Sequence, residues 1–284
     1  MIYAIKTHKL CKNYKKVVAL HNVDISVPIG KIYGLIGPNG AGKTTLIKLL
    51  CGLLRPTSGF VKVLGLDPVE EALQLTKLIG YMPQNPALYE DLSIKDNVGF
   101  FAEAMDIMNT KTEVTDILNF VELSHRKNDK VYKLSGGLKK RVSFACTLVH
   151  KPKILFLDEP TAAIDPDLKA KTWKLFRKLA NQGNTIFVST HMMEEAINCD
   201  QIAIVIGGRV VTIITPSAYR EKGMLKLKIT YKKGKELNET IMANPKKLAI
   251  FLKALGLDGD IKTVEIEEEG LEKILFKMIN EIIK

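Results

Sequence analysis

Continuous apolar runs alternate with helical patterns through the middle of the chain. The runs ILFLD (154–158), TIFVS (185–189) and IAIVI (202–206) show almost no polar alternation, which is typical of strands buried on both faces of a sheet. The segment AKTWKLFRKLA (170–180) between two of them has the spacing of an amphipathic helix. Strands that alternate with helices predict a parallel sheet with crossover connections, and therefore an α/β fold.

Two other regions have different patterns. From Lys6 to Pro28 the sequence predicts antiparallel strands. Residues from about 85 to 150 predict mostly helices, because the apolar positions of VGFFAEAM (98–105) and EVTDILNFVEL (113–123) recur with helical spacing. An antiparallel β subdomain and a helical subdomain are therefore expected beside the parallel sheet.

The character of the chain changes at Gly223. Strict alternation in MLKLKITYKK (224–233) predicts a half-buried strand, and TVEIEEE (263–269) predicts another. A helix is expected between them over 244–256, and a last helix over 270–283. We therefore expect a small appendage of β-α-β-α type, without a catalytic constellation of its own.

Composition narrows the class of protein. Of the 284 residues, 46% are hydrophobic and 26% are charged, which is ordinary for a soluble globular protein. The 42 basic and 31 acidic residues give a net charge of +11, which suits nucleotides, nucleic acid or an anionic membrane surface and selects none of them. Because the excess lysines are spread along the chain, a solvated basic surface explains them better.

Cysteines and apolar stretches narrow the class further. Cys11, Cys51, Cys146 and Cys199 lie far apart without a CxxC pair, which argues against a zinc site or a disulfide framework and fits a reducing cytosol. The N-terminus has no apolar signal core. The most apolar stretch (202–214) is too short to span a bilayer and is broken by Gly-Gly-Arg, so it predicts two buried strands around a turn. If the protein works at a membrane, another chain must supply the span.

The stretch IYGLIGPNGAGKTTLIKLL (32–50) joins an apolar strand to an amphipathic helix through a glycine-rich loop. Gly37, Gly42, Lys43 and Thr44 fill the pattern G-x-x-x-x-G-K-[ST]. In this pattern the glycines let backbone N–H groups surround phosphate oxygens, the lysine offers a positive charge to the β- and γ-phosphates, and the threonine can ligate Mg²⁺. The stretch therefore predicts a nucleotide phosphate site.

A second apolar strand ends in acidic residues. KILFLDEP (153–160) has four apolar residues followed by Asp158 and Glu159. Beside a phosphate site, Asp158 could hold Mg²⁺ through water and Glu159 could activate a water molecule. The alternative is a strand that simply ends in acidic turn residues.

The stretch LSGGLKKR (134–141) is an unusual start for a helix, because glycine disfavours helix interiors. Ser135 could cap the helix, but Gly136 and Gly137 follow it before the apolar run VSFACTLV. One interpretation is a flexible helix entry. The other is a helix N-terminus without side chains, which lets an anion reach the backbone N–H groups.

In their order along the chain, these motifs resemble those of ATP-binding cassette (ABC) ATPases, the motor subunits of ABC transporters. IGPNGAGKTT, GYMPQ, LSGG, LFLDEP, AAIDP and STH follow the family's order within roughly residues 1–222. The resemblance implies that two copies meet head to tail, with ATP between the phosphate loop of one and the LSGG signature of the other. Leu138 stands where the commonest signature has glutamine, and LKKR resembles the drug-exporter (daunorubicin-resistance-like) branch.

The resemblance also implies roles for individual residues. Contacts with ATP are expected from Tyr14, Gly37, Asn39, Gly40, Ala41, Gly42, Lys43, Thr44, Thr45, Ser135, Gly136, Gly137 and Asp165. Catalytic roles are expected for Glu159 as general base and for Lys43, Gln84 and His191, and Mg²⁺ is expected at Thr44, Gln84 and Asp158.

Four of these residues have plain structural alternatives. Tyr14, expected to stack on adenine, could be a half-exposed strand residue, and Gln84 could lie in a surface turn. His191, at the end of a strand, could be a core histidine whose ring is already hydrogen-bonded. Asp165 precedes a proline and could be a turn residue.

The expected fold is α/β: a P-loop NTPase core with a mixed sheet flanked by helices, an antiparallel β subdomain and a helical signature subdomain at about 85–150. This main domain is expected over residues 1–222, and the small α/β C-terminal appendage over 223–284. The expected function is ATP binding and hydrolysis that powers transport, in the export direction, through a separate transmembrane permease subunit. ATP and Mg²⁺ are the expected cofactors, and a second ABC ATPase subunit is the expected partner in an ATP-dependent dimer.

Two other functions are compatible with some of these motifs. One is a soluble ABC ATPase that acts on nucleic acid or ribosomes, but the chain has neither the long coiled-coil insertion of DNA-repair members nor the second cassette usual in translation factors. The other is a module that senses ATP without hydrolysing it, against which Glu159 and His191 argue. No nucleic-acid partner is therefore expected, and the expected location is cytoplasmic, on the inner face of the cell membrane.

Overall fold

The computed structural model of the chain describes residues 3–216, 224–231, 236–242, 250, 253 and 261–268. The chain divides into two compact units, Met1–His191 with Ala203–Ile213, and Met192–Ile202 with Ile214–Lys284. Each unit is described by itself below. In the described part of the chain, no helix is long and apolar enough to cross a membrane.

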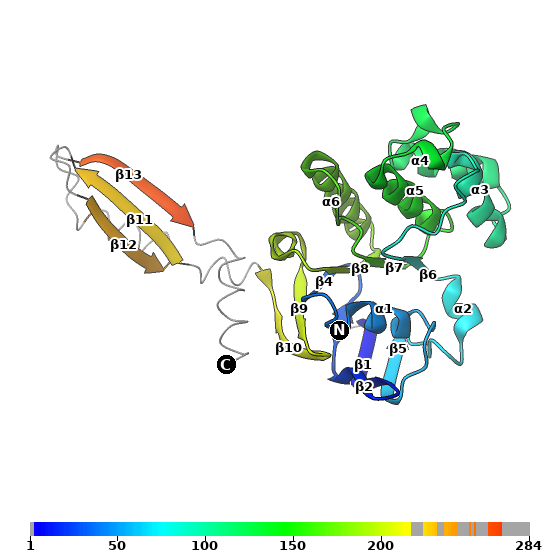
Figure 1. The fold of residues 1–284 in the computed structure, drawn as a ribbon, viewed down its shortest axis with the longest axis horizontal. Coiled ribbons are helices and arrows are strands. Elements are labelled where there is room, and N and C mark those ends of the chain that lie inside the picture. The colour runs from blue at the N-terminus through cyan, green and yellow to red at the C-terminus, as the bar shows by residue number, and fades with distance from the viewer. Residues whose placement is uncertain are drawn as a thin grey trace. The chain divides into compact units, whose positions relative to one another are not determined.

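A six-stranded sheet carries the core of the first unit (Figure 1). Its strands are β4 (Ile32–Ile36), β6 (Ile79–Met82), β7 (Ile154–Asp158), β8 (Thr185–Thr190), β9 (Gln201–Ile206) and β10 (Arg209–Ile214), in the order β10-β9-β4-β8-β7-β6. The neighbours β4, β8, β7 and β6 run parallel, and β4, β7 and β8 are buried along their whole length. The predicted parallel sheet is therefore confirmed.

Aromatic packing fixes the middle of this sheet. Tyr33 on β4 stacks on Phe187 of β8 with ring centroids 5.5 Å apart, and Phe156 on β7 lies 5.8 Å from Phe187. All three side chains are fully buried. The ends of β4, β7 and β8, where the polar motifs begin, are therefore held by a close-packed core.

The apolar stretch 202–214 forms β9 and β10 around a turn at Gly207 and Gly208, both with positive φ. The strands were predicted, and β9 is almost completely buried. The second strand differs from the prediction, because β10 is mostly half-buried and Ile213 is exposed. β10 is an edge strand of the sheet, so it lacks a neighbouring strand on one side.

The helices of the first unit lie on the two sides of the six-stranded sheet (Figure 1). They are α1 (Lys43–Leu50), α2 (Ala72–Thr76), α3 (Ile94–Ala104), α4 (Thr110–Phe120), α5 (Gly136–Leu148) and α6 (Pro166–Asn181), with 3-10 turns η1 (Ser124–Arg126) and η2 (Val131–Lys133). A further 3-10 turn, η3 (Met193–Asn198), lies in the second unit. The helices α3, α4 and α5 pack on one another, as predicted for residues 85–150.

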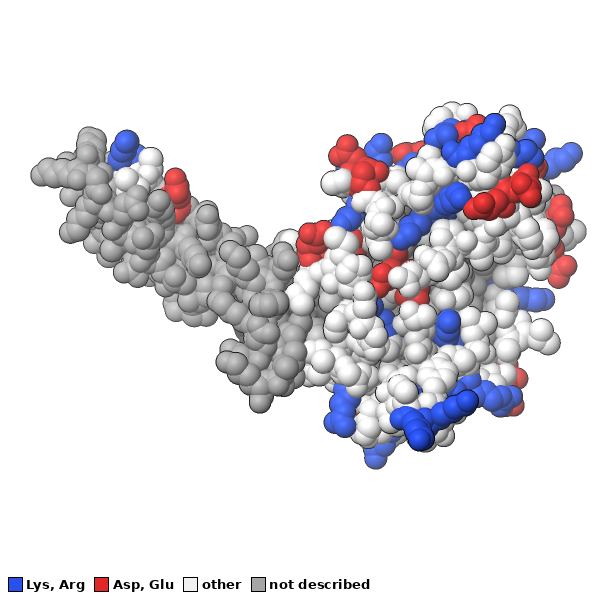
Figure 2. Space-filling view, in the orientation of Figure 1, with Lys and Arg blue, Asp and Glu red and all other residues white. Residues whose placement is uncertain are grey.

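A separate antiparallel sheet lies near the N-terminus. It consists of β1 (Tyr3–Tyr14), β2 (Val17–Val23), β3 (Ser26–Pro28) and β5 (Ser58–Val63), with β2, β3 and β5 all paired to β1. The antiparallel strands predicted up to Pro28 are confirmed, whereas β5 was not predicted. Figure 2 shows lysine and arginine side chains over this region, and acidic and basic side chains mixed over the helical region.

The described part of the second unit contains a three-stranded antiparallel sheet. Its strands are β11 (Met224–Tyr231), β12 (Glu236–Met242) and β13 (Ile261–Glu268), in the order β12-β11-β13. The strands β11 and β13 were predicted, but β12 was not. The two predicted helices, over 244–256 and 270–283, lie outside the described residues except for Ile250 and Lys253, which are helical and exposed.

Candidate functional site

The loop between β4 and α1 has the backbone that its glycines predict. Gly42, immediately before α1, has a φ of +102°, which residues with a side chain rarely adopt. A Cβ at Gly37 would lie 2.2 Å from the carbonyl oxygen of Val205, so no side chain fits there. Pro38, Asn39 and Gly40 are exposed at the tip of the loop. The loop therefore presents backbone, with little side-chain cover, at the start of a helix.

Three other predicted contacts are less exposed than the tip of the loop, and two of them lie in the helix. Ala41 is buried and donates its N–H to Pro38, whereas Thr44 and Thr45 are half-buried in the first turn of α1. Their hydroxyl groups therefore lie at the positively polarised end of the helix, where a phosphate or its metal ion would be bound.

The Lys43 side chain is folded back over this loop. Its Nζ donates to the carbonyl oxygens of Gly37 at 2.8 Å and Pro38 at 3.0 Å, and it lies 3.7 Å from Oε1 of Glu159. Burial lowers the pKa of Lys43, while the charges of Glu159 and Asp158 act in the opposite direction without cancelling that effect. The ammonium is thus placed between the phosphate loop and the acidic strand, within reach of any phosphate bound there.

Asp158 ends β7 and is only 1% exposed. Its Oδ1 accepts a hydrogen bond from the Ser189 hydroxyl, whereas Oδ2 is buried and has no hydrogen-bond partner among the described residues. A buried carboxylate oxygen without a partner is costly, and it suits a cation.

A Mg²⁺ ion fits this arrangement. The described residues contain no cluster of three or more His, Cys, Asp or Glu side chains suited to a metal. Mg²⁺ needs no such cluster, because it keeps several water molecules and is commonly held by one or two protein oxygens together with phosphates of the substrate. The donor set expected from the sequence, Thr44, Gln84 and Asp158, is of this kind.

Glu159 is the point where the predicted catalytic side chains meet. Its carboxylate accepts a hydrogen bond from Gln84 Nε2 at 3.2 Å, lies 3.2 Å from Nδ1 of His191, and faces Lys43 on its other oxygen. Gln84 follows β6, His191 follows β8, and Glu159 follows β7, so neighbouring parallel strands deliver all three to one edge of the sheet. Glu159 is 7% exposed, whereas the His191 side chain is 42% exposed.

The predicted start of the LSGG helix is confirmed, and its two glycines differ. Ser135 is the N-cap of α5 and accepts a long hydrogen bond, 3.4 Å, from Leu138 N. A Cβ on Gly136 would meet no atom within 4 Å, whereas one on Gly137 would lie 2.9 Å from Leu168 Cδ2. In Figure 1, α5 and α1 lie on opposite sides of strands β6 to β8. Gly137 therefore packs against α6, whereas the position at Gly136 is open among the described residues.

Two other predicted residues lie at the edges of the site. Tyr14 ends β1 with 42% of its surface exposed, and the Lys12 ammonium lies 5.2 Å from the centre of its ring. A half-exposed ring of this kind can stack on a base. Asp165 is exposed and its Oδ1 accepts from Leu168 N at 2.9 Å, which makes it the N-cap of α6. Asp165, for which the alternative from the sequence was a turn residue, is thus a helix cap.

Two residues that contact Asp158 or Glu159 were not predicted from the sequence. Ser189 binds Asp158 through its hydroxyl and also accepts a hydrogen bond from Glu159 N at 3.1 Å. Lys140, on α5, donates to the carbonyl oxygen of Glu159 at 2.8 Å. A hydroxyl near the end of the buried strand TIFVST was a usable signal for Ser189. No signal in the sequence distinguishes Lys140 from its basic neighbours.

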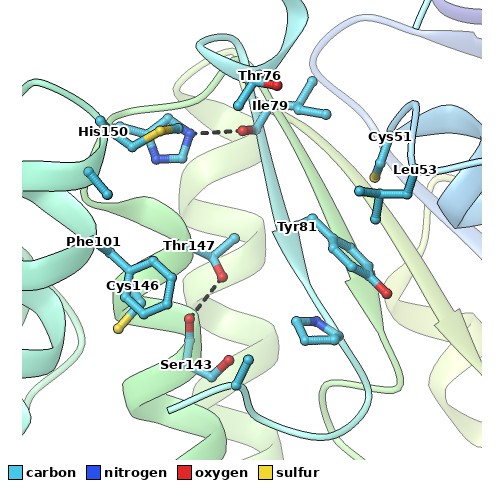
Figure 3. A pocket seen from close by; sticks show the side chains of 14 residues that line it. Cys51, Leu53, Thr76, Ile79, Tyr81, Phe101, Ser143, Cys146, Thr147 and His150 are labelled. Atoms are coloured by element: carbon cyan, nitrogen blue, oxygen red, sulfur yellow. Dashed lines mark hydrogen bonds between the residues drawn. The ribbon is translucent and has the colours of Figure 1, made fainter. Parts of the chain in front are cut away.

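A cavity of about 260 Å³ lies apart from this cluster, between β6 and the helices α3 and α5 (Figure 3). Its lining includes Tyr81, Phe101, Cys146 and His150. His150 hydrogen-bonds to the Ile79 carbonyl, and burial lowers its pKa; burial likewise raises the pKa of Tyr81 to about 12 and that of Cys146 above its usual range. These groups are therefore neutral near pH 7, and the cavity suits an apolar occupant.

The known proteins that this chain resembles are ATP-binding proteins, which agrees with a nucleotide site of this kind. The family described as ABC transporter matches residues 20–162. The probable multidrug ABC transporter ATP-binding protein YbhF of Escherichia coli K12 is 37% identical over 217 residues, which are 75% of this chain and 37% of that protein. The Nod factor export ATP-binding protein I of Burkholderia orbicola is 36% identical over 213 residues, which are 74% of this chain and 70% of that protein.

Among solved structures, the ATP-binding cassette MJ0796 is similar with a TM-score of 0.69 and 28% identity, over 75% of this chain and 98% of that one. It is described as a dimer in a post-hydrolysis state bound to ADP and Pi. The relatives carry names of multidrug, Nod factor export and daunorubicin resistance proteins, which agrees with the drug-exporter branch predicted from the signature. The chain belongs to the ABC transporter family and is one of its ATP-binding cassettes.

Proposed function

We propose that the chain binds ATP with Mg²⁺ and hydrolyses it to ADP and phosphate, in order to power export through a separate transmembrane subunit. The observation that carries the proposal is the convergence of Lys43, Gln84 and His191 on the buried Glu159. The chain spans only 37% of the length of YbhF, so the activity of that whole protein supports this assignment only in part.

In the proposed reaction, Glu159 accepts the proton of the attacking water, whose oxygen forms the new bond to the γ-phosphorus while the bond to ADP breaks. Gln84 and His191 orient the carboxylate and the water, since both lie within hydrogen-bond reach of the same carboxylate oxygen. Lys43 and the N–H groups of the loop stabilise the negative charge on the transferring phosphoryl group. Mg²⁺, held by Thr44, Gln84 and Asp158, would supply further charge neutralisation.

The open end of α5 supports a head-to-tail dimer. Ser135 and Gly136 are exposed at the start of α5, and α5 lies on the other side of strands β6 to β8 from α1. A helix N-terminus with an exposed hydroxyl, followed by a glycine, suits the γ-phosphate of a nucleotide on a second copy. Tyr14 would stack on the adenine of the ATP whose phosphates are bound by the loop of the same chain. Asp165, the cap of α6, would lie near the partner.

The transmembrane partner is proposed from the family and from the cavity beside α3 and α5. The cavity is lined by neutral groups, and Leu53 at its edge and Phe100 on α3 are exposed apolar side chains. An apolar side chain from a cytoplasmic loop of the transmembrane subunit would bury this surface. The membrane association of the chain would then come entirely from that subunit.

The test is phosphate release by the purified chain with MgATP, alone and with a polytopic membrane protein if a neighbouring gene encodes one. We expect hydrolysis that stops when EDTA removes Mg²⁺ and that rises when the membrane protein is added in detergent or nanodiscs. If the chain binds ATP but releases no phosphate under either condition, it is an ATP sensor and the proposal is wrong. Salt-sensitive binding of nucleic acid would favour the soluble rival.

A further inference from the structure

Lys140 joins the signature helix to the turn that carries Glu159. It lies on α5, five residues after Ser135, and its Nζ donates to the Glu159 carbonyl oxygen at 2.8 Å and to the Ala162 carbonyl oxygen at 2.6 Å. Its two basic neighbours have different partners. Lys139 binds Glu90 at 2.6 Å, and Arg141 binds Glu122 at 3.4 Å.

The turn that accepts these hydrogen bonds has an unfavourable backbone. Glu159 has a φ of +48° and Ala163 a φ of +57°, although neither is glycine. Residues with a side chain occupy this left-handed region only where the surroundings hold them there. The direction of the Glu159 carboxylate follows from this backbone, so whatever fixes the turn also fixes the carboxylate.

The peptide of Glu159 is held from both sides. Its N–H donates to the carbonyl and the hydroxyl of Ser189 on β8, at 3.2 and 3.1 Å. Its carbonyl oxygen accepts from Lys140 on α5 at 2.8 Å and, within the turn itself, from Ala162 N at 3.3 Å. Removing the Lys140 ammonium would leave the Ser189 contacts and the longer hydrogen bond of the turn, and would take away the shorter hydrogen bond to the carbonyl oxygen.

The position of Lys140 itself is well fixed. Phe144, one turn further along α5, packs against Phe176 of α6 with ring centroids 5.2 Å apart. Gly137, one turn earlier, lies close to Leu168 of α6, and a Cβ there would be 2.9 Å from Leu168 Cδ2. The Lys140 side chain borders the small space between these contacts, together with Pro160 and Ile164. The ammonium therefore reaches the Glu159 turn from a helix that is clamped on either side of it.

We propose that Lys140 is a positioning residue that holds the backbone of Glu159 in its left-handed conformation and so aims the water-activating carboxylate. The inference rests on the proposed role of Glu159 as general base. The proposed role of Lys140 has a consequence for the dimer, because Ser135 caps the same helix on which Lys140 lies. A displacement of α5 by the partner's nucleotide would be passed through Lys140 to the carboxylate of this chain's own site.

The test compares three variants of the full-length chain. Lys140→Met keeps the aliphatic stem and removes the ammonium, Lys140→Arg keeps a charged donor, and Lys139→Met makes the same chemical change at a neighbour that does not touch the turn. For Lys140→Met we expect a kcat lower by about 10- to 100-fold, which corresponds to the loss of a charged hydrogen bond. We expect the Kd for ATP to stay within about threefold, because Lys140 makes none of the expected phosphate contacts.

The control variants and dimer formation separate positioning from general stability. Lys140→Arg should recover most of the lost kcat, and Lys139→Met should match the wild type. Lys140→Met should still form the ATP-dependent dimer on gel filtration, because its signature end is unchanged. A kcat equal to that of the wild type would overturn the inference. Loss of ATP binding and of the dimer together with kcat would also overturn it, since the residue would then be needed for folding.

A double mutant tests whether Lys140 acts through Glu159. In a Glu159→Gln background there is no base left to aim, so Lys140→Met should change the residual rate by less than about twofold. A further loss as large as that in the wild-type background would mean that Lys140 acts elsewhere. If the wild-type chain itself releases no phosphate, the proposed function fails; if it does and Lys140→Met equals it, only the inference fails.

Discussion

The acidic end of the sheet and the signature end of α5 differ in how complete they are. Around Glu159, three side chains from separate strands and loops meet within 3.7 Å, and the carboxylate is 7% exposed. At the signature, Ser135 is exposed with one long hydrogen bond of 3.4 Å, and a Cβ on Gly136 would touch nothing. One region is assembled within the chain, and the other is left open.

This difference indicates which other molecules each region must bind in order to work. The side chains of the acidic cluster are bonded to one another, and Oδ2 of Asp158, which has no hydrogen-bond partner among the described residues, suits a cation. At the signature end, the Ser135 hydroxyl has one long hydrogen bond in the described part of the chain, which is reasonable if a second copy brings the nucleotide. Mutations should therefore abolish chemistry at the first region and assembly at the second.

The largest effect is expected from Glu159→Gln, which tests the complete region. The amide has nearly the same shape but cannot accept the proton of the attacking water, so kcat should fall by about 10²- to 10⁴-fold. ATP binding should persist, and the dimer should accumulate with ATP and Mg²⁺ on gel filtration. The exposed Glu90→Gln is the matched control. Turnover close to that of the wild type would remove Glu159 from the role of base.

Ser135→Arg tests the open region. The long side chain would occupy the space in front of the helix end, so the ATP-dependent dimer and steady-state hydrolysis should both be lost. Binding of ATP to the monomer, measured by calorimetry, should stay within about threefold of the wild type, because Ser135 caps α5 and is not part of the loop that precedes α1.

Mixing sharpens the test of Ser135→Arg. In a head-to-tail pair of Ser135→Arg and Lys43→Ala chains, one site combines both defects and the other joins two intact halves. Some hydrolysis should therefore return on mixing, although neither protein is active alone. If Ser135→Arg alone keeps wild-type dimerisation and hydrolysis, LSGG is no more than a flexible helix entry.

The two glycines allow a finer test within a single turn of helix. Gly137→Ala places a Cβ 2.9 Å from Leu168 Cδ2, which must shift, so this contact should offset part of the helix preference of alanine and its Tm should lie below that of Gly136→Ala. Gly136→Ala has free space, so its Tm should be unchanged or slightly higher, since alanine favours helix by up to about 1 kcal/mol. It should nevertheless lower hydrolysis several-fold, because in the proposed dimer its methyl group would face the partner's nucleotide. Full activity of Gly136→Ala would mean that nothing approaches that position.

Local sequence patterns predicted the acidic end of the sheet and the phosphate loop. They predicted contacts between distant segments less well. ILFLD and TIFVS are continuous apolar runs, and the loop before Lys43 carries its pattern within a few residues. The strand β12 was missed, because ELNETIM becomes a strand through its pairing with β11, as at Ile241 opposite Leu225. The reach of Lys140 to the Glu159 carbonyl depends on how α5 packs on α6, which no local pattern records.

The smallest expected effect is on the pH dependence of stability, and it comes from the buried ammonium of Lys43 beside Glu159. Burial lowers the pKa of Lys43 below its ordinary value of 10.5, so between the lowered value and 10.5 the unfolded chain binds more protons than the folded one. Stability of the wild type should therefore rise with pH in that window relative to Lys43→Met, by at most about 1.4 kcal/mol per pH unit. Urea unfolding of both proteins at several pH values from 7 to about 10 measures this difference. Tyr81, whose pKa is raised to about 12, is present in both proteins and cancels. A difference that stays flat or falls with pH would mean that Lys43 is hydrated in the nucleotide-free chain, and that this region is less closed than Glu159 and its partners indicate.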